Sequence, residues 1–163
     1  MRKTYAAVLA LLAPALLCLS ETPAAAAGPR TVWIDYKADK AWPVRSAVAF
    51  VDRFTGSQLR FGACRPKYPC VQIREKRKLA NPSWAAVTYV GNNPTRIELS
   101  ATRRGMSYSL RYDTLVHELG HAFGVHSHNK SCSSIMYYSL TCPNGRNSTL
   151  AFSSAEKAML KRH

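Results

Sequence analysis

The order of apolar and polar residues predicts a strand and then an amphipathic helix near the start of the folded chain. Residues 31–36 alternate in part between apolar and polar side chains, as in a strand with one buried face. The segment 42–54 instead carries apolar residues at helical spacing, and Pro43 suits its first turn. This stripe consists of Val44, Ala47, Val48, Val51 and Phe54. We expect it to pack into the core.

More strands are predicted before the chain returns to helical periodicity. The segments rich in β-branched and aromatic residues are 58–61, 70–74, 84–90 and 96–100. A Gly-Asn-Asn-Pro sequence at 91–94 supplies the turn between the last two.

Two helices are predicted in the C-terminal half. The first covers about 113–123, with Asp113 or Thr114 as its N-cap and Gly124 ending it with a positive φ. The second starts at Ser153, where Glu156 three residues later completes a capping box. A strand, a helix, several strands and two helices together indicate an α+β domain with a mixed sheet.

The first 27 residues have the features of a secretory signal peptide. A basic dipeptide precedes an apolar run at 5–19, and small residues of the A-x-A type follow at 24–27. The run is short and contains Pro14, so it fits a membrane anchor poorly. We predict cleavage after residue 27, which leaves 28–163 as a single secreted, extracellular domain that is long enough to bury a core.

The cysteines indicate two disulfides. Cys18 lies in the predicted leader, and four of the five cysteines of the chain remain after it. An even number of cysteines in an exported chain is typical of disulfide pairing, and three pairings are possible. We favour the local pairs Cys64–Cys70 and Cys132–Cys142, because each closes a short loop.

The chain is strongly basic, with 23 Lys and Arg residues, 9 Asp and Glu residues and a formal net charge of +14. A protein of this charge is expected to associate non-specifically with polyanions or the cell envelope. The charges are scattered, and no nucleic-acid-binding module is recognisable. We therefore expect a monomer with no specific nucleic-acid partner and no membrane span.

Four of the five histidines lie within residues 117–128. His117 and His121 are four residues apart, so a helix places both imidazoles on one face, where they can bind one cation. Glu118 is rotated about 100° around the helix axis. It is therefore a poor third ligand but well placed to contact a water molecule near the ion. This H-E-x-x-H pattern predicts a metal site, and imidazole ligands favour zinc, Zn²⁺.

The segment around these histidines resembles the metzincin zinc endopeptidases. The matching pieces are His117–Gly124, which reads H-E-x-x-H-x-x-G, and Ser134–Tyr138, which resembles the methionine turn of that family. The small size of the chain and Cys132 before the turn are similar to compact secreted bacterial members, matrixin-like or snapalysin-like. The resemblance implies a metzincin-like zincin fold with a mixed twisted sheet, an active-site helix, a Met-turn and a C-terminal helix.

The third ligand departs from the family pattern, because the position expected for it is Ser127, with His126 and His128 on either side. Matrixin-like spacing from Met136 selects His128, whereas snapalysin-like spacing selects His126. We favour His128, because one extra residue after the helix only enlarges a loop, at a small cost in free energy. His126 stays open as the alternative.

The resemblance also implies a mechanism. A zinc-activated water hydrolyses the peptide bond, Glu118 acts as general base, and Tyr138 donates to the oxyanion. Met136 packs beneath the metal, and the strand at 85–90 is a candidate edge that pairs with an extended protein or peptide substrate.

A second hypothesis is a basic secreted binding protein whose zinc site is structural or vestigial. The charge of the chain favours it, whereas an unliganded carboxylate at Glu118 argues against it, since a structural site has no use for one.

Overall fold

A computed structural model describes residues 30–139, 142 and 151–163. The signal peptide predicted at 1–27 lies outside this part of the chain and stays a prediction. In chain order, the elements are β1 (Thr31–Lys37), α1 (Val44–Asp52), β2 (Gln58–Phe61), β3 (Cys70–Lys76), β4 (Ala86–Tyr89), β5 (Thr95–Ser100), a 3₁₀ turn (Ala101–Arg103), α2 (Tyr108–Ala122) and α3 (Ser154–Leu160). Every predicted strand and helix is present, with some shifts of the ends.

The strands form one five-stranded sheet in the order β2-β1-β3-β5-β4. β1 pairs in parallel with β2 and β3, and β3 pairs in parallel with β5, whereas β4 is antiparallel to β5. The prediction of a mixed sheet in an α+β domain is therefore confirmed. β4 forms an edge of the sheet, which is what binding of an extended peptide there requires.

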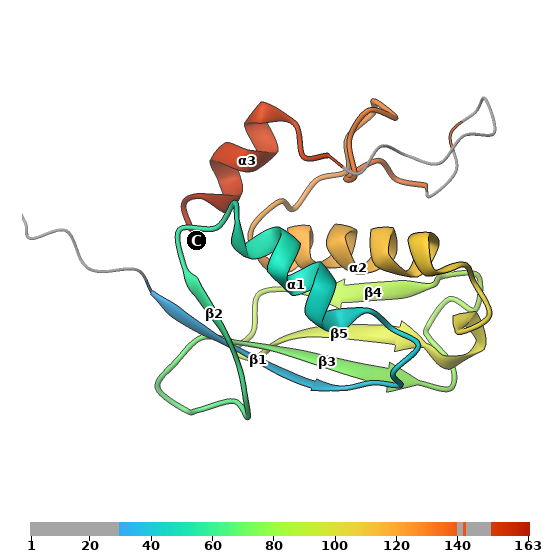
Figure 1. Ribbon diagram of the computed structural model, residues 1–163, viewed down its shortest axis with the longest axis horizontal. Coiled ribbons are helices and arrows are strands. Elements are labelled where there is room, and N and C mark those ends of the chain that lie inside the picture. The colour runs from blue at the N-terminus through green and yellow to red at the C-terminus, as the bar shows by residue number, and fades with distance from the viewer. Residues whose placement is uncertain (1–29, 140–141, 143–150) are drawn as a thin grey trace, which may run out of the picture.

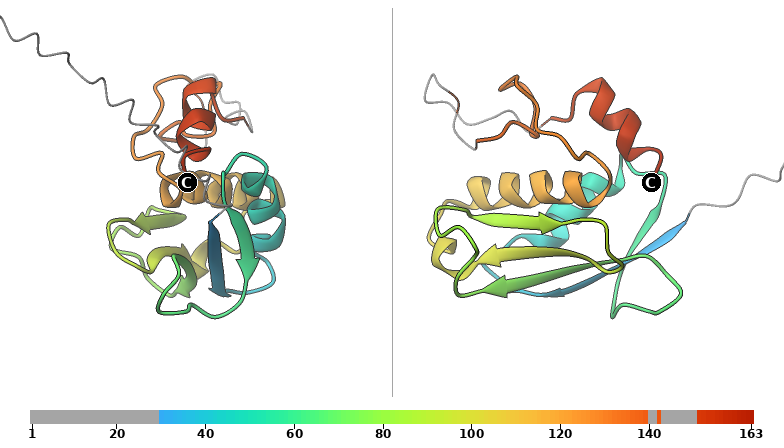
Figure 2. Two further views of the ribbon diagram at one scale, coloured as in Figure 1. Left: turned by 90° about the vertical axis from the view of Figure 1, so that its left-hand side faces the viewer. Right: turned by 180° about the vertical axis from the view of Figure 1, so that it is seen from behind.

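Helices α1 and α2 cover one face of the sheet (Figure 1). α3 and the segment 125–139 lie on the far side of α2 from the sheet, so that α2 lies between two layers (Figures 1 and 2). Helix α2, which carries the H-E-x-x-H sequence, is thus packed between the sheet on one side and α3 with the segment 125–139 on the other.

The core lies between the sheet and the two helices. Ile34, Ile73 and Ile97 of the three central strands are fully buried. The predicted stripe of α1 packs against them, with Val44, Ala47, Val48 and Val51 buried and Phe54 partly buried at its end. α2 contributes Leu115, Val116 and Leu119, all with no exposed surface. Because each fully buried Val, Leu or Ile is worth about 1.5–3 kcal/mol, this contact holds α2 firmly to the sheet.

Both predicted disulfides are present. Cys64 is bonded to Cys70 at the start of β3, and Cys132 is bonded to Cys142. The second bond ties the segment that precedes the predicted methionine turn to the segment that follows it.

The predicted N-cap of α2 is wrong. The helix begins at Tyr108, and Ser107 caps it by accepting a hydrogen bond of 3.3 Å from the Leu110 backbone. Asp113 and Thr114 instead lie inside the helix, where the Thr114 hydroxyl donates to the Leu110 carbonyl at 2.7 Å. The earlier start is held by Arg111, whose guanidinium donates to the Ala41 carbonyl at 2.7 Å.

The predicted end of α2 and the predicted start of α3 agree with the structure. Gly124 follows α2 with φ of +95°, and Ser153 and Glu156 form the capping box of α3. α1 is shorter than expected and begins at Val44, one residue after Pro43. None of the helices in the described ranges is long and apolar enough to cross a membrane.

Candidate metal centre

Helix α2 places His117 and His121 on one face, as the sequence predicts. Their Nε2 atoms lie 3.1 Å apart, and both rings are partly buried. The helix is held below by the buried Leu115 and Leu119, so the two rings sit on a rigid support.

His128 joins them from the loop after α2. Its Nε2 atom lies 3.3 Å from that of His121, and its ring centroid lies 5.1 Å from that of His117. One ligand nitrogen from each of the three residues lies within 4.8 Å of the other two. His126 is exposed and lines the same cleft, but it is not part of this group.

The direction of the loop follows from Gly124 and Val125, shortly after the end of α2 at Ala122. Gly124 takes a positive φ of +95°, a conformation that favours glycine. Val125 is buried, and its backbone N–H donates to the Gly120 carbonyl at 3.0 Å. With Val125 fixed against the end of α2, the residues that follow are led back toward the face that carries His117 and His121.

Hydrogen bonds fix the tautomers of the two helical histidines. Nδ1 of His117 lies 2.8 Å from the Ile135 carbonyl, and Nδ1 of His121 lies 2.6 Å from the Val125 carbonyl. Because a carbonyl oxygen only accepts, each Nδ1 carries the proton and each Nε2 presents a lone pair. Burial lowers the pKa of His117 to about 4 and also lowers that of His121, so both rings are neutral at pH 7.

The three nitrogens suit a tetrahedral metal ion. Two lone pairs that face each other at 3.1 Å repel, and a shared cation removes that repulsion. With metal–nitrogen bonds of about 2.0–2.1 Å, tetrahedral ligand atoms lie about 3.3 Å apart. The separations of His121 Nε2 from those of His117 and His128, at 3.1 and 3.3 Å, are close to this value. Nδ1–H groups held by carbonyls are the usual outer partners of such ligands. The residues present therefore fit zinc.

Glu118 lies in the same cleft but outside the histidine group. Its side chain is nearly buried, at 8 % exposure, and one carboxylate oxygen accepts a hydrogen bond of 2.5 Å from the Thr88 hydroxyl of β4. Burial raises the pKa of Glu118 to about 7, and the bond from Thr88 opposes that rise. A carboxylate that lines the cleft without joining the ligand set is placed to act on a bound molecule.

The predicted methionine turn packs beneath α2. Met136 has no exposed surface and contacts Gly120 of the helix. The Asn129 backbone donates to the Met136 carbonyl at 2.7 Å, which joins the loop of His128 to the turn. Met136 therefore packs against α2, in the supporting position that the resemblance implies.

A buried carboxylate of α3 ties these parts together. Glu156 is only 4 % exposed and accepts hydrogen bonds from the Asn129 side chain at 2.9 Å and from the Ser134 hydroxyl at 2.7 and 2.8 Å. The sequence predicted Glu156 only as part of a capping box. Its second role depends on contacts more than 20 residues away along the chain, which periodicity does not reveal.

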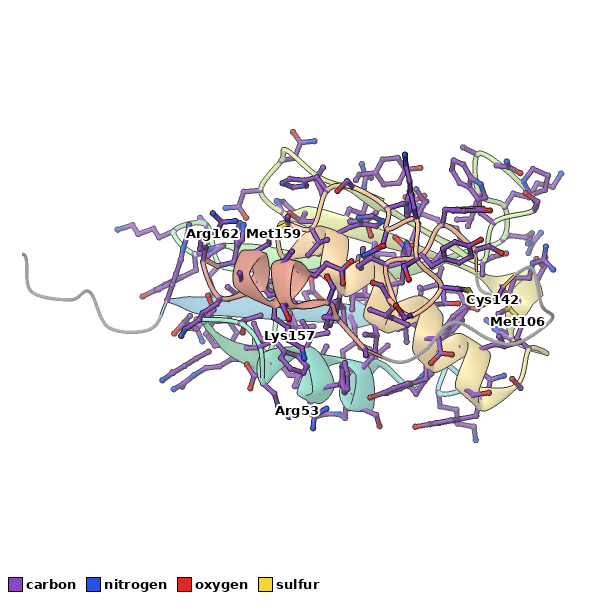
Figure 3. The ribbon with its side chains drawn as sticks, turned by 90° about the horizontal axis from the view of Figure 1, so that it is seen from above. Arg53, Met106, Cys142, Lys157, Met159 and Arg162 are labelled. Atoms are coloured by element: carbon purple, nitrogen blue, oxygen red, sulfur yellow. A yellow bond between two sulfur atoms is a disulfide. The ribbon has the colours of Figure 1, made fainter. Side chains whose placement is uncertain are left out.

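These groups line a cleft of about 790 Å³ between β4 and the segment that follows α2. Apolar side chains make up much of its walls. Those from β4, its flanks and the start of α2 are Trp84, Val87, Val90, Met106 and Leu110. Figure 3 shows Met106 at the opposite end of the molecule from Arg162 of the C-terminal segment.

Both tyrosines of the turn line the cleft. Tyr138, the predicted oxyanion donor, is 67 % exposed, whereas Tyr137 is buried, and their ring centroids lie 4.3 Å apart. A hydrogen bond to Tyr138 raises the pKa of the Tyr137 hydroxyl. Tyr138 is therefore the more exposed of the two rings at the cleft, and Tyr137 packs behind it.

Comparisons with known proteins bear on the fold. No family model matches the chain, and no curated protein matches it in sequence. Among solved structures, the crystal structure of myroilysin is similar, with a TM-score of 0.51 and 14 % identity over 80 % of this chain and 81 % of that one. At this identity the likeness is one of fold. Together with the histidine group, it is consistent with the metzincin-like fold that the sequence implies.

Proposed function

We propose that this protein is a secreted zinc-dependent endopeptidase. The observation that carries the proposal is the set of three histidine nitrogens around one point, with the nearly buried Glu118 carboxylate in the same cleft. The fold shared with myroilysin supports it.

His117, His121 and His128 are the proposed zinc ligands. Three imidazole ligands leave a fourth position open, which distinguishes a catalytic zinc site from a closed structural one. His126 is the alternative for the third position, and the group of nitrogens within 4.8 Å of one another favours His128.

Each of the chain's own groups has a role in the proposed reaction. Zinc bound here would supply a water molecule of lowered pKa and polarise the scissile carbonyl. Glu118 takes the proton of the attacking water and passes it to the leaving amine. Tyr138 turns into the cleft and donates to the oxyanion that develops on the carbonyl.

The edge strand supplies the surface for the substrate. β4 pairs with β5 along only one of its sides, so backbone groups on its other side are available to an extended peptide. The apolar walls contributed by Trp84, Val87 and Leu110 favour peptides with apolar side chains near the scissile bond. A protein or peptide in extended form is therefore the proposed substrate.

Export of the protein is also part of the proposal. The two disulfides are compatible with an oxidising compartment outside the cell. We further expect a monomer whose basic surface associates with anionic polymers of the cell envelope.

Glu118→Gln tests the proposed activity. Wild-type protein should contain one zinc per chain and cleave a broad set of quenched peptides. Glu118→Gln should keep the zinc and lose about 10²–10⁴-fold in kcat/KM. The exposed His126→Ala serves as a control that should retain both. Wild-type protein that binds one zinc but cleaves none of the peptides would support a structural or vestigial zinc site instead.

A further inference from the structure

The Thr88 hydroxyl lies between the edge strand and the carboxylate of Glu118. Its oxygen is 2.5 Å from Oε2 of Glu118 and 3.1 Å from the Glu118 carbonyl oxygen. Thr88 belongs to β4 and Glu118 to α2, so this bond connects the substrate-binding edge with the helix that carries the base.

The distance identifies the acceptor. A hydroxyl has one proton to donate, and O–H···O⁻ bonds to a charged acceptor are typically about 2.5–2.7 Å long. The shorter contact therefore takes the proton, and the carboxylate of Glu118 accepts it. Within the described ranges, Thr88 provides the only side-chain hydrogen bond to this carboxylate.

The sheet fixes the position of the hydroxyl. Thr88 is paired with Ile97 of β5, which has no exposed surface. A β-branched side chain has few rotamers, so the hydroxyl direction follows from the strand. Glu118, by contrast, has three rotatable side-chain bonds and a nearly buried carboxylate that needs a partner.

We propose that Thr88 is a positioning residue that holds the Glu118 carboxylate in the orientation needed for proton transfer. This inference rests on the function proposed above. Without the hydroxyl, Glu118 keeps its place on α2 but its carboxylate samples other rotamers, and displacement of a catalytic group by about 1 Å can cost about 10²-fold in rate. The effect therefore falls on the chemical step rather than on substrate or zinc binding.

A purely structural role makes a different prediction. If the bond only held β4 against α2, its loss would lower stability and substrate affinity, since β4 forms a wall of the cleft. It would not act on kcat alone.

The test compares Thr88→Val, which keeps the side-chain shape, with Thr88→Ser, which keeps the hydroxyl. In zinc-loaded protein, Thr88→Val should lower kcat about 10- to 100-fold with KM changed less than about twofold. Thr88→Ser should recover most of the loss. Thr95→Val on β5 is the matched control, because among the described residues the Thr95 hydroxyl bonds only to the Asn92 carbonyl, at 3.4 Å, and Thr95 does not line the cleft.

Two further readouts do not depend on turnover. Zinc content should stay at one per chain in Thr88→Val. In metal-free protein, the shifts in unfolding midpoint caused by Thr88→Val and Glu118→Gln should not add in the double variant, because the two residues share one bond.

The outcomes separate this inference from the function on which it rests. Unchanged kcat in Thr88→Val, a loss confined to KM, or failure of Thr88→Ser to recover activity would each overturn the inference alone. Wild-type protein without peptidase activity would overturn the proposed function, and the inference with it.

Discussion

Gly120 lies against Met136 so closely that no side chain fits between them. A Cβ built on Gly120 would lie 2.5 Å from Met136 Sδ and 3.1 Å from the Phe152 ring. Gly120 belongs to the turn of α2 that also carries His117 and His121. This contact therefore sets the distance between the methionine turn and the helix.

Gly120→Ala should therefore destabilise the protein even though alanine favours helices. Overpacking of a core typically costs about 1–3 kcal/mol, more than the gain of about 1 kcal/mol in helix propensity. We expect a net loss of about 1–2 kcal/mol, measured by urea unfolding of metal-free protein. Gly105→Ala is the control, because nothing lies within 4 Å of the added Cβ there. Equal effects of the two substitutions would contradict the packing argument.

Glu156→Gln should loosen the link between α3, the methionine turn and the loop of His128. Burial by itself would raise the pKa of Glu156, but the hydrogen bonds from Asn129, Ser134 and the Ser153 backbone outweigh it and lower the pKa. Loss of the charge should cost about 2 kcal/mol of unfolding free energy at pH 7 and weaken zinc binding.

The same shift gives a pH dependence. The pKa of Glu156 is lower in the folded protein than in the unfolded chain, so its carboxylate stabilises the fold fully above the unfolded pKa of 4.5. This stabilisation is lost as the pH falls through the folded pKa. The difference between wild type and Glu156→Gln should therefore shrink in acid. Glu98→Gln on β5 is the control, since the ion pairs of Glu98 with Lys76 and Arg96 are long, at 3.9 Å. A difference that stays constant down to pH 2 would argue against this assignment.

Asp113→Asn should stabilise the protein at neutral pH. Asp113 is 7 % exposed, its carboxyl group has no hydrogen-bond partner within the described residues, and burial raises its pKa to about 6. The folded protein therefore holds this proton more tightly than the unfolded chain, so wild-type stability falls as the pH rises from about 4 to about 6.

Thermal unfolding of metal-free protein across this range measures the effect. The variant should match wild type near pH 4 and exceed it by about 1 kcal/mol, or a few degrees in Tm, near pH 7.5. Parallel pH profiles for the two proteins would show that Asp113 is not the group responsible.

The basic surface should bind polyanions without a single docking site. The acidic residues of the described part of the chain are buried or engaged, such as Asp35 with Arg74 at 2.6 Å, so most surface charge is positive. Heparin affinity should fall steeply with salt. Two double variants on different parts of the surface should weaken it to a similar extent: Arg53→Gln/Lys157→Gln and Arg77→Gln/Lys78→Gln. Loss of binding in one pair alone would instead identify a localised site.

The parts of this fold set by local patterns could be predicted from the sequence. The apolar stripe of α1 and the H-E-x-x-H face of α2 depend on spacing within a few turns, and the capping box at Ser153 depends on three residues. The start of α2 could not be predicted, because Asp113 and Thr114 are good N-cap residues in isolation. Contacts of Arg111 with the Ala41 carbonyl and the loop before the helix move the start to Ser107.

The site was predictable only in part for the same reason. Spacing predicted His117, Glu118 and His121 as site residues but left His126 and His128 open, because which of them lies near the helical pair depends on how Val125 docks against α2. The bond from Thr88 to Glu118 joins residues 30 apart in the chain, and nothing around Thr88 marks it as functional.

Zinc affinity of the histidine variants, measured by competition with a chelator, tests the central claim most directly. The account predicts one zinc per chain in wild type and His126→Ala with similar affinity. His117→Ala, His121→Ala and His128→Ala should each lose at least about 100-fold. A wild-type protein that binds no zinc, or a loss in His126→Ala that His128→Ala does not show, would contradict it.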